Sequence, residues 1–177
     1  MNLQGKKVCV FGAKKSGMSA AALLLKVGAC PFIYDENDKF QVITGEFPKK
    51  LLSEIELVVL SPGVPTDLPV VEKLRDAGIP IWGEVELAYR FGSGILMAVT
   101  GTNGKTTTTT LLGEIMKNYH PETFVVGNIG IPYTKVAAEE TRNSVTVAEI
   151  SSFQLETIST FHPKVSAITN ITEDHMN

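Results

Sequence analysis

Short apolar runs alternate along the chain with segments in which apolar residues recur at helical spacing. The apolar run 8–11 ends at a glycine, after which four apolar residues recur three or four positions apart: Met18, Ala21, Ala22 and Leu25. Gly28 then closes the pattern. A run followed by a glycine turn and a 3.6-residue period predicts a strand, a turn and a helix with these four residues on one face.

The same alternation continues along the rest of the chain. Gly78 closes one of the expected helices and Pro80 follows it, as is usual at a helix end. Strands that alternate with helices form parallel sheets joined by helical crossovers, so the fold class is α/β. The further elements that we expect are strands at 32–34, 57–60, 95–100, 123–126, 145–148 and 165–171, and helices at 69–77, 85–91 and 105–118.

A flexible stretch divides the chain into two parts. The glycine-serine-glycine stretch 92–94 separates two self-contained alternating patterns, so we expect one domain at 1–92 and another at 93–177. The second pattern stops directly after the strand expected at 165–171. Because a parallel sheet needs helices on both faces, we expect the second domain to be incomplete and the chain to belong to a longer protein.

The composition is that of an ordinary globular protein, with 44% apolar and 20% charged residues. The net charge is −3 without a lysine or arginine stripe, so we expect neither nucleic acid nor a membrane as a partner. Apolar stretches fall far short of the roughly 20 residues of a membrane span, and we expect a cytoplasmic protein. Cys9 and Cys30 have no second pair to complete a zinc site, and we expect two buried free thiols.

The clearest chemical signal is a glycine-rich loop between an expected strand and an expected helix. Residues 100–106 read TGTNGKT, and the expected helix continues with further threonines. Threonine has a low helix propensity, so local preference alone does not explain why a helix begins here. In a phosphate-binding loop, backbone N–H groups converge on phosphate oxygens, Lys105 reaches the β and γ phosphates, and Thr106 can ligate Mg²⁺. Val99 stands where the Walker A pattern has its first glycine, so a glycine turn with an incidental lysine is the alternative.

Polar residues follow four of the expected strands. Ligands of open α/β sheets bind beyond the carboxyl ends of the strands, which makes these residues candidates for a site. Glu149 stands where a phosphate-loop enzyme holds a carboxylate for Mg²⁺, and His175 could ligate metal or donate to a transferring phosphoryl group. Solvated side chains are the alternative for both. The four residues are Lys105, Asn128, Glu149 and His175.

The first half carries a weaker nucleotide signal. Residues 12–17 have the first and last glycines of the dinucleotide fingerprint. Lys14 replaces the middle glycine, the residue that lets the backbone approach the pyrophosphate closely. Asp35 follows at nearly the usual spacing for an acid that binds a ribose or base. Residues 61–65, SPGVP, form either a rigid turn or a diphosphate contact. These residues alone favour an ordinary strand-end acid and a turn, and they leave a loose nucleotide site open as the alternative.

Four segments, taken together and in order, resemble the Mur ligases. The stretch 151–156, SSFQLE, looks specific to the D-glutamate-adding branch of that family. The resemblance implies a bacterial cytoplasmic enzyme of peptidoglycan synthesis, in which ATP phosphorylates UDP-N-acetylmuramoyl-L-alanine and the amine of D-glutamate attacks the acyl phosphate. The segments are 100–106, 127–130, 148–156 and 170–176.

The resemblance also implies the domain roles. The fold would be a Rossmann-like parallel-sheet domain for the uridine nucleotide at 1–92, followed by part of a P-loop α/β ATPase domain at 93–177. The amino-acid domain and a carbamylated lysine would lie beyond residue 177. We expect ATP and Mg²⁺ as cofactors and a monomer as the oligomeric state.

Residue by residue, the resemblance implies Lys105 and His175 as catalytic residues. The alternatives that remain are another Mur ligase, a folylpolyglutamate synthetase-like ligase, and a nucleotide-binding module without activity. The implied binding residues are Gly101, Thr102, Asn103, Gly104, Lys105, Thr106 and Thr107 for ATP; Thr106, Glu149 and His175 for metal; and Lys15, Ser16, Asp35, Ser61, Gly63, Asn128, Gln154 and His175 for the muramoyl substrate.

Overall fold

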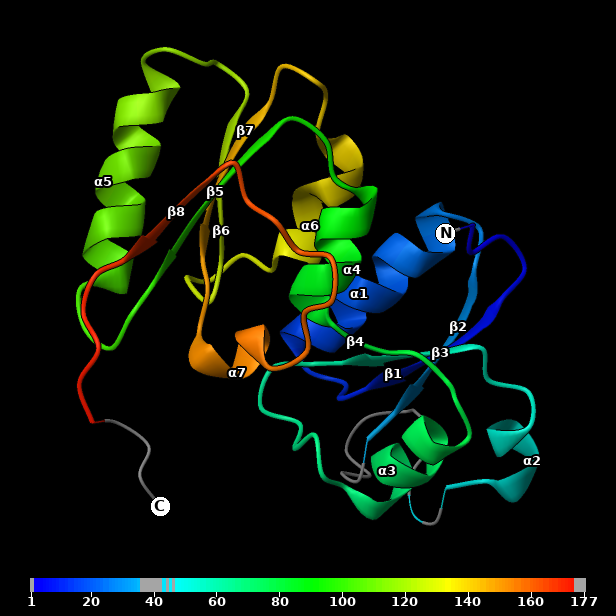
Figure 1. Ribbon diagram of the computed structural model, residues 1–177. Coiled ribbons are helices and arrows are strands. Elements are labelled where there is room, and N and C mark those ends of the chain that lie inside the picture. The colour runs from blue at the N-terminus through cyan, green and yellow to red at the C-terminus, as the bar shows by residue number, and fades with distance from the viewer. Residues whose placement is uncertain (1, 36–42, 44, 46, 174–177) are drawn as a thin grey trace.

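The computed structural model describes residues 2–35, 43, 45 and 47–173. Its strands are β1 (Lys7–Phe11), β2 (Cys30–Tyr34), β3 (Leu57–Leu60), β4 (Ile81–Gly83), β5 (Ile95–Thr100), β6 (Thr123–Gly127), β7 (Val145–Glu149) and β8 (Val165–Ile168). They form two four-stranded sheets, in the orders β2-β1-β3-β4 and β6-β7-β5-β8 (Figure 1). All neighbouring strands in these sheets pair in parallel, which confirms the predicted α/β class.

Helices connect the strands and cover the sheets. They are α1 (Lys15–Lys26), α2 (Lys49–Leu52), α3 (Pro69–Asp76), α4 (Glu84–Phe91), α5 (Lys105–Lys117), α6 (Tyr133–Val136) and α7 (Ser152–Leu155), with a 3-10 turn at Ala137–Glu139. Strand β1 is buried on both faces: Val8 and Val10 pack into one core cluster, and Cys9 and Phe11 into another. Such two-sided burial explains why its sequence is a continuous apolar run.

Three helices lie between the two sheets. Figure 1 shows α1, α4 and α6 side by side in this position, and α6 contacts both of the others. The core that they share reaches from Val10 of the first sheet, through Leu24 and Leu87, to Ala98 of the second. A common apolar core holds the two sheets together at this joint.

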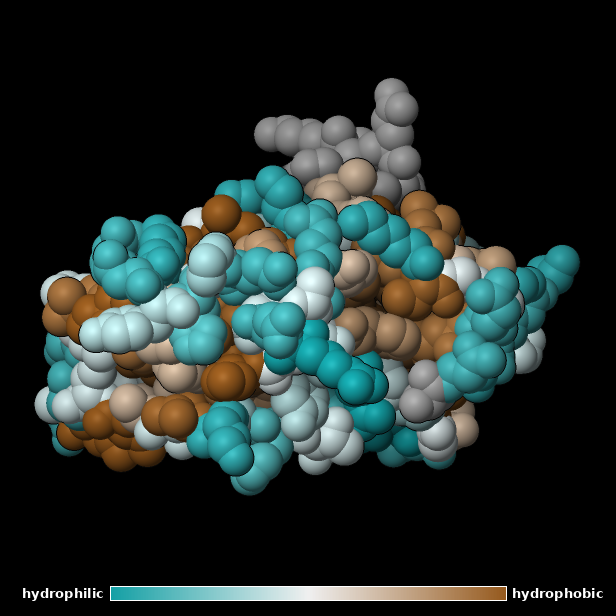
Figure 2. Space-filling view, turned by 90° about the horizontal axis from the view of Figure 1, so that it is seen from above, coloured by the Kyte–Doolittle hydropathy of each residue, from teal (hydrophilic) through white to brown (hydrophobic). Residues whose placement is uncertain are grey.

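The outer side of the second sheet is less covered. Helix α5 packs on β6 and β7, yet its Leu111 and Ile115 are 60% and 46% exposed, and Tyr119 just after the helix is 75% exposed. Figure 2 shows apolar side chains at the surface on the side where α5 lies. The edge strand β8 is exposed along its whole length.

The predicted face of helix α1 is wrong. Met18 and Leu25 are 54% and 64% exposed, whereas the buried leucines of the helix are Leu23 and Leu24. Residues 20–25 are apolar without interruption, so the sequence contains more than one apolar face at helical spacing. Contacts with the sheets and with α6 decide which face is buried.

Other expectations differ in smaller ways. Cys9 is buried as predicted, but the expectation that Cys30 is buried is wrong, because it begins β2 at the edge of its sheet. Strand β8 ends at Ile168 instead of residue 171, and the three-residue β4 and four-residue α7 are too short to show a period. Among the described residues, no helix has the length and apolar character needed to cross a membrane.

Candidate functional site

The glycine-rich loop joins the end of β5 to the first turn of α5, as its sequence predicts. Gly104 has φ +82° in the left-handed region and precedes the helix as its N-cap residue. A Cβ built on Gly104 would meet no atom within 4 Å, so the space in front of the helix is open. The first N–H groups of a helix have no acceptor within it, and here they face this space. The loop therefore presents a binding place for an anion.

Lys105 folds back over the loop. Its ammonium donates hydrogen bonds to the carbonyl oxygens of Gly101 (2.7 Å) and Thr102 (2.9 Å). These two bonds keep the positive charge beside the open helix start. A phosphate arriving there would meet both the N–H groups and the ammonium.

A buried carboxylate lies next to this loop. Glu149 ends β7, is 2% exposed, and accepts hydrogen bonds from Thr106 Oγ1 (2.7 Å) and Asn128 Nδ2 (3.0 Å). Within the described part of the chain, no lysine, arginine or histidine forms an ion pair with it. A buried carboxylate with two neutral donors and no cation of the protein leaves a negative charge for a bound cation to neutralise.

The strand order explains why these side chains meet. Strands β6, β7 and β5 are neighbours, so Asn128, Glu149 and the loop all lie at one end of the sheet. The backbone holds the pair as well, because the Asn128 N–H donates to the Glu149 carbonyl at 2.9 Å. The loop, Lys105, Asn128 and Phe153 line a cavity of about 620 Å³.

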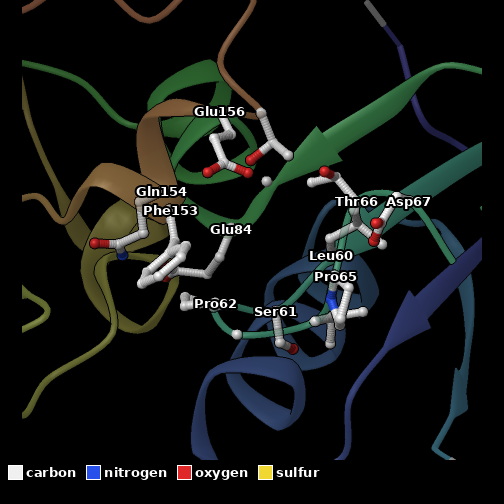
Figure 3. A pocket seen from close by; sticks show the side chains of 14 residues that line it. Leu60, Ser61, Pro62, Pro65, Thr66, Asp67, Glu84, Phe153, Gln154 and Glu156 are labelled. Atoms are coloured by element: carbon white, nitrogen blue, oxygen red, sulfur yellow. The ribbon is translucent and has the colours of Figure 1, made fainter. Parts of the chain in front are cut away.

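A second cavity, of about 450 Å³, lies between the two sheets (Figure 3). The loop after β3 lines it with Ser61 and Gly63, and α7 lines it with Gln154. Ser151 and Gln154 form a capping box at the start of α7, in which the Ser151 N–H donates to Gln154 Oε1 at 2.9 Å. The four-residue helix is thus fixed by its own side chains at the cavity wall.

Two acidic side chains of α4 attach this helix to the second half of the chain. Glu84 accepts from the N–H and hydroxyl of Thr134, both at 2.8 Å, and burial raises its pKa although these bonds lower it. Glu86 accepts from the hydroxyl of Thr160 at 2.6 Å and from the N–H of Phe161 at 3.0 Å. Burial opposes its charge, but the hydrogen bonds outweigh burial and lower the pKa of Glu86.

Comparisons with known proteins agree with this geometry. The family model described as Mur ligase MurD-like, N-terminal domain, matches residues 6–83, and the model described as Mur ligase middle domain matches residues 99–177. The chain belongs to the Mur ligase family. This confirms the resemblance that the sequence motifs indicate.

Curated relatives of this Mur ligase chain match it along its whole length. A protein of Lachnoclostridium phytofermentans is 56% identical, and one of Lachnospira eligens is 52% identical. Both are named UDP-N-acetylmuramoylalanine–D-glutamate ligase, and the chain spans 42% of the length of each.

Solved Mur ligase structures share the fold. The UDP-N-acetylmuramate:L-alanyl-gamma-D-glutamyl-meso-diaminopimelate ligase from Neisseria meningitides aligns over 98% of this chain and 63% of its own, with a TM-score of 0.59 at 17% identity. The UDP-N-acetylmuramate-alanine ligase from Thermotoga maritima aligns over 96% of this chain and 42% of its own, with a TM-score of 0.55 at 25% identity.

The donor set of this Mur ligase chain fits a magnesium ion. Thr106 and Glu149 offer a hydroxyl and a carboxylate oxygen side by side, which are hard ligands of the kind that Mg²⁺ prefers. Within the described ranges, no three His, Cys, Asp or Glu side chains gather to enclose a metal ion by themselves. An ion held by so few protein ligands suits Mg²⁺, which usually completes its shell with phosphate and water.

Of the other predicted residues, Asp35 and Ser61 both contact the loop 12–17, where the Ser61 hydroxyl donates to the Gly12 carbonyl at 3.4 Å. The Asp35 carboxylate accepts from the Ala13 N–H at 2.6 Å, and the Lys15 ammonium contacts the carbonyl of Gly130. Lys15 lines a third cavity, between α1 and the segment 132–139, while Ser61 lines the cavity of Figure 3. Ser16 stands beside Lys15 in the first turn of α1, and His175 lies outside the described residues. The roles of these residues stay predictions.

Sequence reasoning missed the residues that support the site. Glu84 and Glu86 gave no signal, because two acids in a short amphipathic helix usually face solvent. Asn170 and Thr172 hydrogen bond to the phosphate loop, and the signal for them was present, since they follow the strand next to β5. Residues that follow a neighbouring parallel strand lie beside the loop.

Proposed function

We propose that the protein is an ATP-dependent ligase that joins D-glutamate to UDP-N-acetylmuramoyl-L-alanine in bacterial peptidoglycan synthesis. The names of the relatives support the reaction. The observation that carries the proposal is the contact of Thr106 and Asn128 with the buried Glu149, beside Lys105 at the end of the sheet. This cluster supplies cationic, hydroxyl and carboxylate groups at one phosphate-sized opening.

The proposed domain roles follow the two sheets. Residues 1–92 would hold the uridine nucleotide, and residues 93–177 would hold ATP as part of a larger ATPase domain. The cavity between the sheets touches both parts, which suits a substrate whose uridine end and carboxylate end bind different domains. We place the reaction in the cytoplasm, where ATP is supplied.

The first chemical step is a phosphoryl transfer. An oxygen of the alanyl carboxylate attacks the γ-phosphorus of ATP, the bond to the bridging oxygen breaks, and ADP leaves with that electron pair. In this proposal Lys105 exchanges its bonds to the Gly101 and Thr102 carbonyls for bonds to the phosphates. Thr106 and Glu149 would hold Mg²⁺, which neutralises phosphate charge when bound. The N–H groups from Gly104 to Thr107 would bind the remaining phosphate oxygens.

The second step forms the amide. The amine of D-glutamate attacks the acyl phosphate, the tetrahedral intermediate collapses, and phosphate leaves with the electrons of the C–O bond. Asn128 and Gln154 would position the muramoyl substrate, and Ser61, Gly63, Asp35, Lys15 and Ser16 its nucleotide end. His175, which the family resemblance implies as a metal or substrate ligand, would contact a second metal ion or the substrate. Holding the amine near the acyl carbon supplies a large part of the rate acceleration, up to about 11 kcal/mol.

The test is a reconstitution with the full-length protein that carries this sequence. We expect ADP, phosphate and the D-glutamyl product only when ATP, Mg²⁺, UDP-N-acetylmuramoyl-L-alanine and D-glutamate are all present, measured by phosphate release and mass spectrometry. Product with L-alanine, a diamino acid or a folate in place of the cognate partner would favour another ligase of the family. Binding of uridine nucleotide without any turnover would favour the binding module.

A further inference from the structure

The phosphate loop is held by a segment from elsewhere in the chain. Residues 169–172 leave β8 beside the loop, because β8 and β5 are paired strands. The side-chain amide of Asn170 makes two hydrogen bonds with the backbone of Asn103: its Oδ1 accepts from the Asn103 N–H, and its Nδ2 donates to the Asn103 carbonyl, both at 2.9 Å. Thr169 Oγ1 donates to the same carbonyl at 2.7 Å.

Thr102 completes the attachment. Its N–H donates to the Asn170 carbonyl at 3.0 Å, and its hydroxyl donates to the Thr172 carbonyl at 3.1 Å and accepts from the Thr172 N–H at 3.0 Å. The two segments are also in close contact, since a Cβ on Gly101 would lie 2.3 Å from Thr169 Oγ1. Two consecutive loop residues therefore have their backbone groups bound to one neighbouring segment.

We propose that Asn170 is a positioning residue that holds the phosphate loop in its nucleotide-binding conformation before the nucleotide arrives. The proposal rests on the proposed function, because it assigns the loop to ATP. Both polar atoms of the Asn170 amide are engaged by Asn103, so this side chain acts through the loop and not on the phosphates. The Asn103 N–H is likewise already bound, which leaves the phosphates to the N–H groups from Gly104 onward.

The benefit is preorganisation. A loop with glycines at 101 and 104 samples many backbone conformations when it is free, and fixing each residue costs conformational entropy. Hydrogen bonds that fix the loop in the free protein remove this cost from nucleotide binding. An amide suits the position, because it satisfies an N–H and a carbonyl together and adds no negative charge beside the phosphate site.

The test uses the full-length protein and four variants with a matched control. Asn170→Ala removes both bonds to Asn103, and Asn170→Asp keeps the acceptor but replaces the donor by a charge. Thr169→Val removes the hydroxyl that Thr169→Ser retains. Asn118→Ala is the control. Asn118 caps the C-terminus of α5, at the end of the helix away from the phosphate loop, and its side-chain amide donates to the Glu114 carbonyl. Measured are the Kd and KM of MgATP, the KM of the uridine substrate, kcat, and amide hydrogen exchange of residues 101–104 without nucleotide.

We expect Asn170→Ala to weaken the binding of MgATP about tenfold, which corresponds to about 1.4 kcal/mol. The KM of the uridine substrate should stay within about twofold of the wild-type value. Asn170→Asp should weaken MgATP binding at least as much as Asn170→Ala, and Thr169→Val should weaken it less. Thr169→Ser and Asn118→Ala should bind MgATP as the wild type does. Exchange at 101–104 should accelerate in Asn170→Ala without nucleotide.

Two outcomes would overturn the proposal. One is unchanged MgATP affinity and unchanged exchange in Asn170→Ala. The other is an equal loss of MgATP and uridine binding together with a lower Tm, because that pattern indicates a merely structural role. Failure of the proposed function gives a different result: wild type would bind no MgATP and form no product, while the exchange of residues 101–104 would still report whether Asn170 fixes the loop.

Discussion

The chain contains two glycine loops with the same strand–loop–helix topology, and the last glycine of each has different surroundings. The loop 101–104 leaves the start of α5 open, since a Cβ on Gly104 meets nothing within 4 Å. In the loop 12–17, a Cβ on Gly17 would lie 1.7 Å from the Gly12 carbonyl oxygen and 2.8 Å from Ser61 Oγ. At the last glycine of the loop 12–17, protein atoms occupy the space that lies open at Gly104.

The side chain that binds each loop differs in charge. In both loops a residue after a neighbouring strand accepts a backbone N–H: Asp35 accepts from Ala13 at 2.6 Å, and Asn170 accepts from Asn103 at 2.9 Å. A carboxylate at the first loop repels phosphate, whereas a neutral amide at the second does not. In the proposed function, the loop 12–17 serves the nucleotide end of the muramoyl substrate and the loop 101–104 serves ATP.

Removing the charge of the phosphate loop should have the largest effect. We predict that Lys105→Ala lowers kcat/KM of the full-length enzyme about 10³-fold, because a lysine at this place stabilises charge on the transferred phosphoryl group. Binding of UDP to the first sheet should stay within about twofold, by calorimetry. Lys135→Ala, on the third cavity, is the matched control. Turnover of Lys105→Ala within about threefold of wild type would remove Lys105 from the mechanism.

The second-largest effect is a loss of stability, which can be compared directly between the two loops. Gly17→Ala places a methyl group against a backbone oxygen, and we expect a loss of about 3 kcal/mol in the free energy of unfolding. Gly104→Ala meets no atom but keeps a left-handed φ of +82°, so its loss should be about 1 kcal/mol. Urea unfolding of both variants measures the difference. Equal losses would mean that the filled and open loops are not distinguished by packing.

The sequence predicted the fold well where burial is two-sided. Strand β3, buried at all four residues, was predicted with its observed bounds because a buried parallel strand is a continuous apolar run. Strand β5 was also predicted with its observed bounds, since glycines flank it on both sides, although Ile95 is exposed. The face of α1 could not be predicted, since an all-apolar stretch satisfies several helical faces equally. Burial there depends on α6, which is far away in the sequence.

The sequence predicted residues of the candidate site but not the residues that hold the surrounding elements in place. Lys105, Asn128 and Glu149 each follow a strand, and the structure brings them together at one end of the sheet. Besides Arg90 in its own helix, Glu86 has partners more than 70 residues further along the chain, at 159–161, and no local pattern connects it with them. Long-range hydrogen bonds to backbone groups leave no periodic trace in a sequence.

A smaller effect tests the charge difference between the loops. We predict that Asp35→Asn lowers stability by about 1 kcal/mol, because a charge-assisted bond to the Ala13 N–H becomes a neutral one. Uridine nucleotide binding should weaken, while MgATP affinity should stay within about twofold of wild type. Asp76→Asn, at the exposed end of α3, is the matched control. A gain in phosphate affinity at the first loop without loss of uridine binding would contradict the assignment of Asp35 to the nucleoside.

The smallest effect concerns the joint between the two sheets and its dependence on pH. Hydrogen bonds lower the pKa of Glu86 below its unfolded value, so its carboxylate stabilises the fold above the unfolded pKa of about 4.3, and this contribution is lost as the pH falls through the folded pKa. Burial raises the pKa of Glu84, so its charge costs stability above the folded pKa, and lowering the pH removes that cost. Acidification therefore lowers stability through Glu86 and raises it through Glu84.

We predict that Glu86→Gln makes the free energy of unfolding less sensitive to acid between pH 3 and 5. Glu84→Gln should make the free energy of unfolding fall more steeply on acidification. Urea unfolding at a series of pH values measures both slopes, with Glu72→Gln of α3 as the control. Slopes that shift in the same direction in both variants would show that the two carboxylates do not carry opposite roles at the joint.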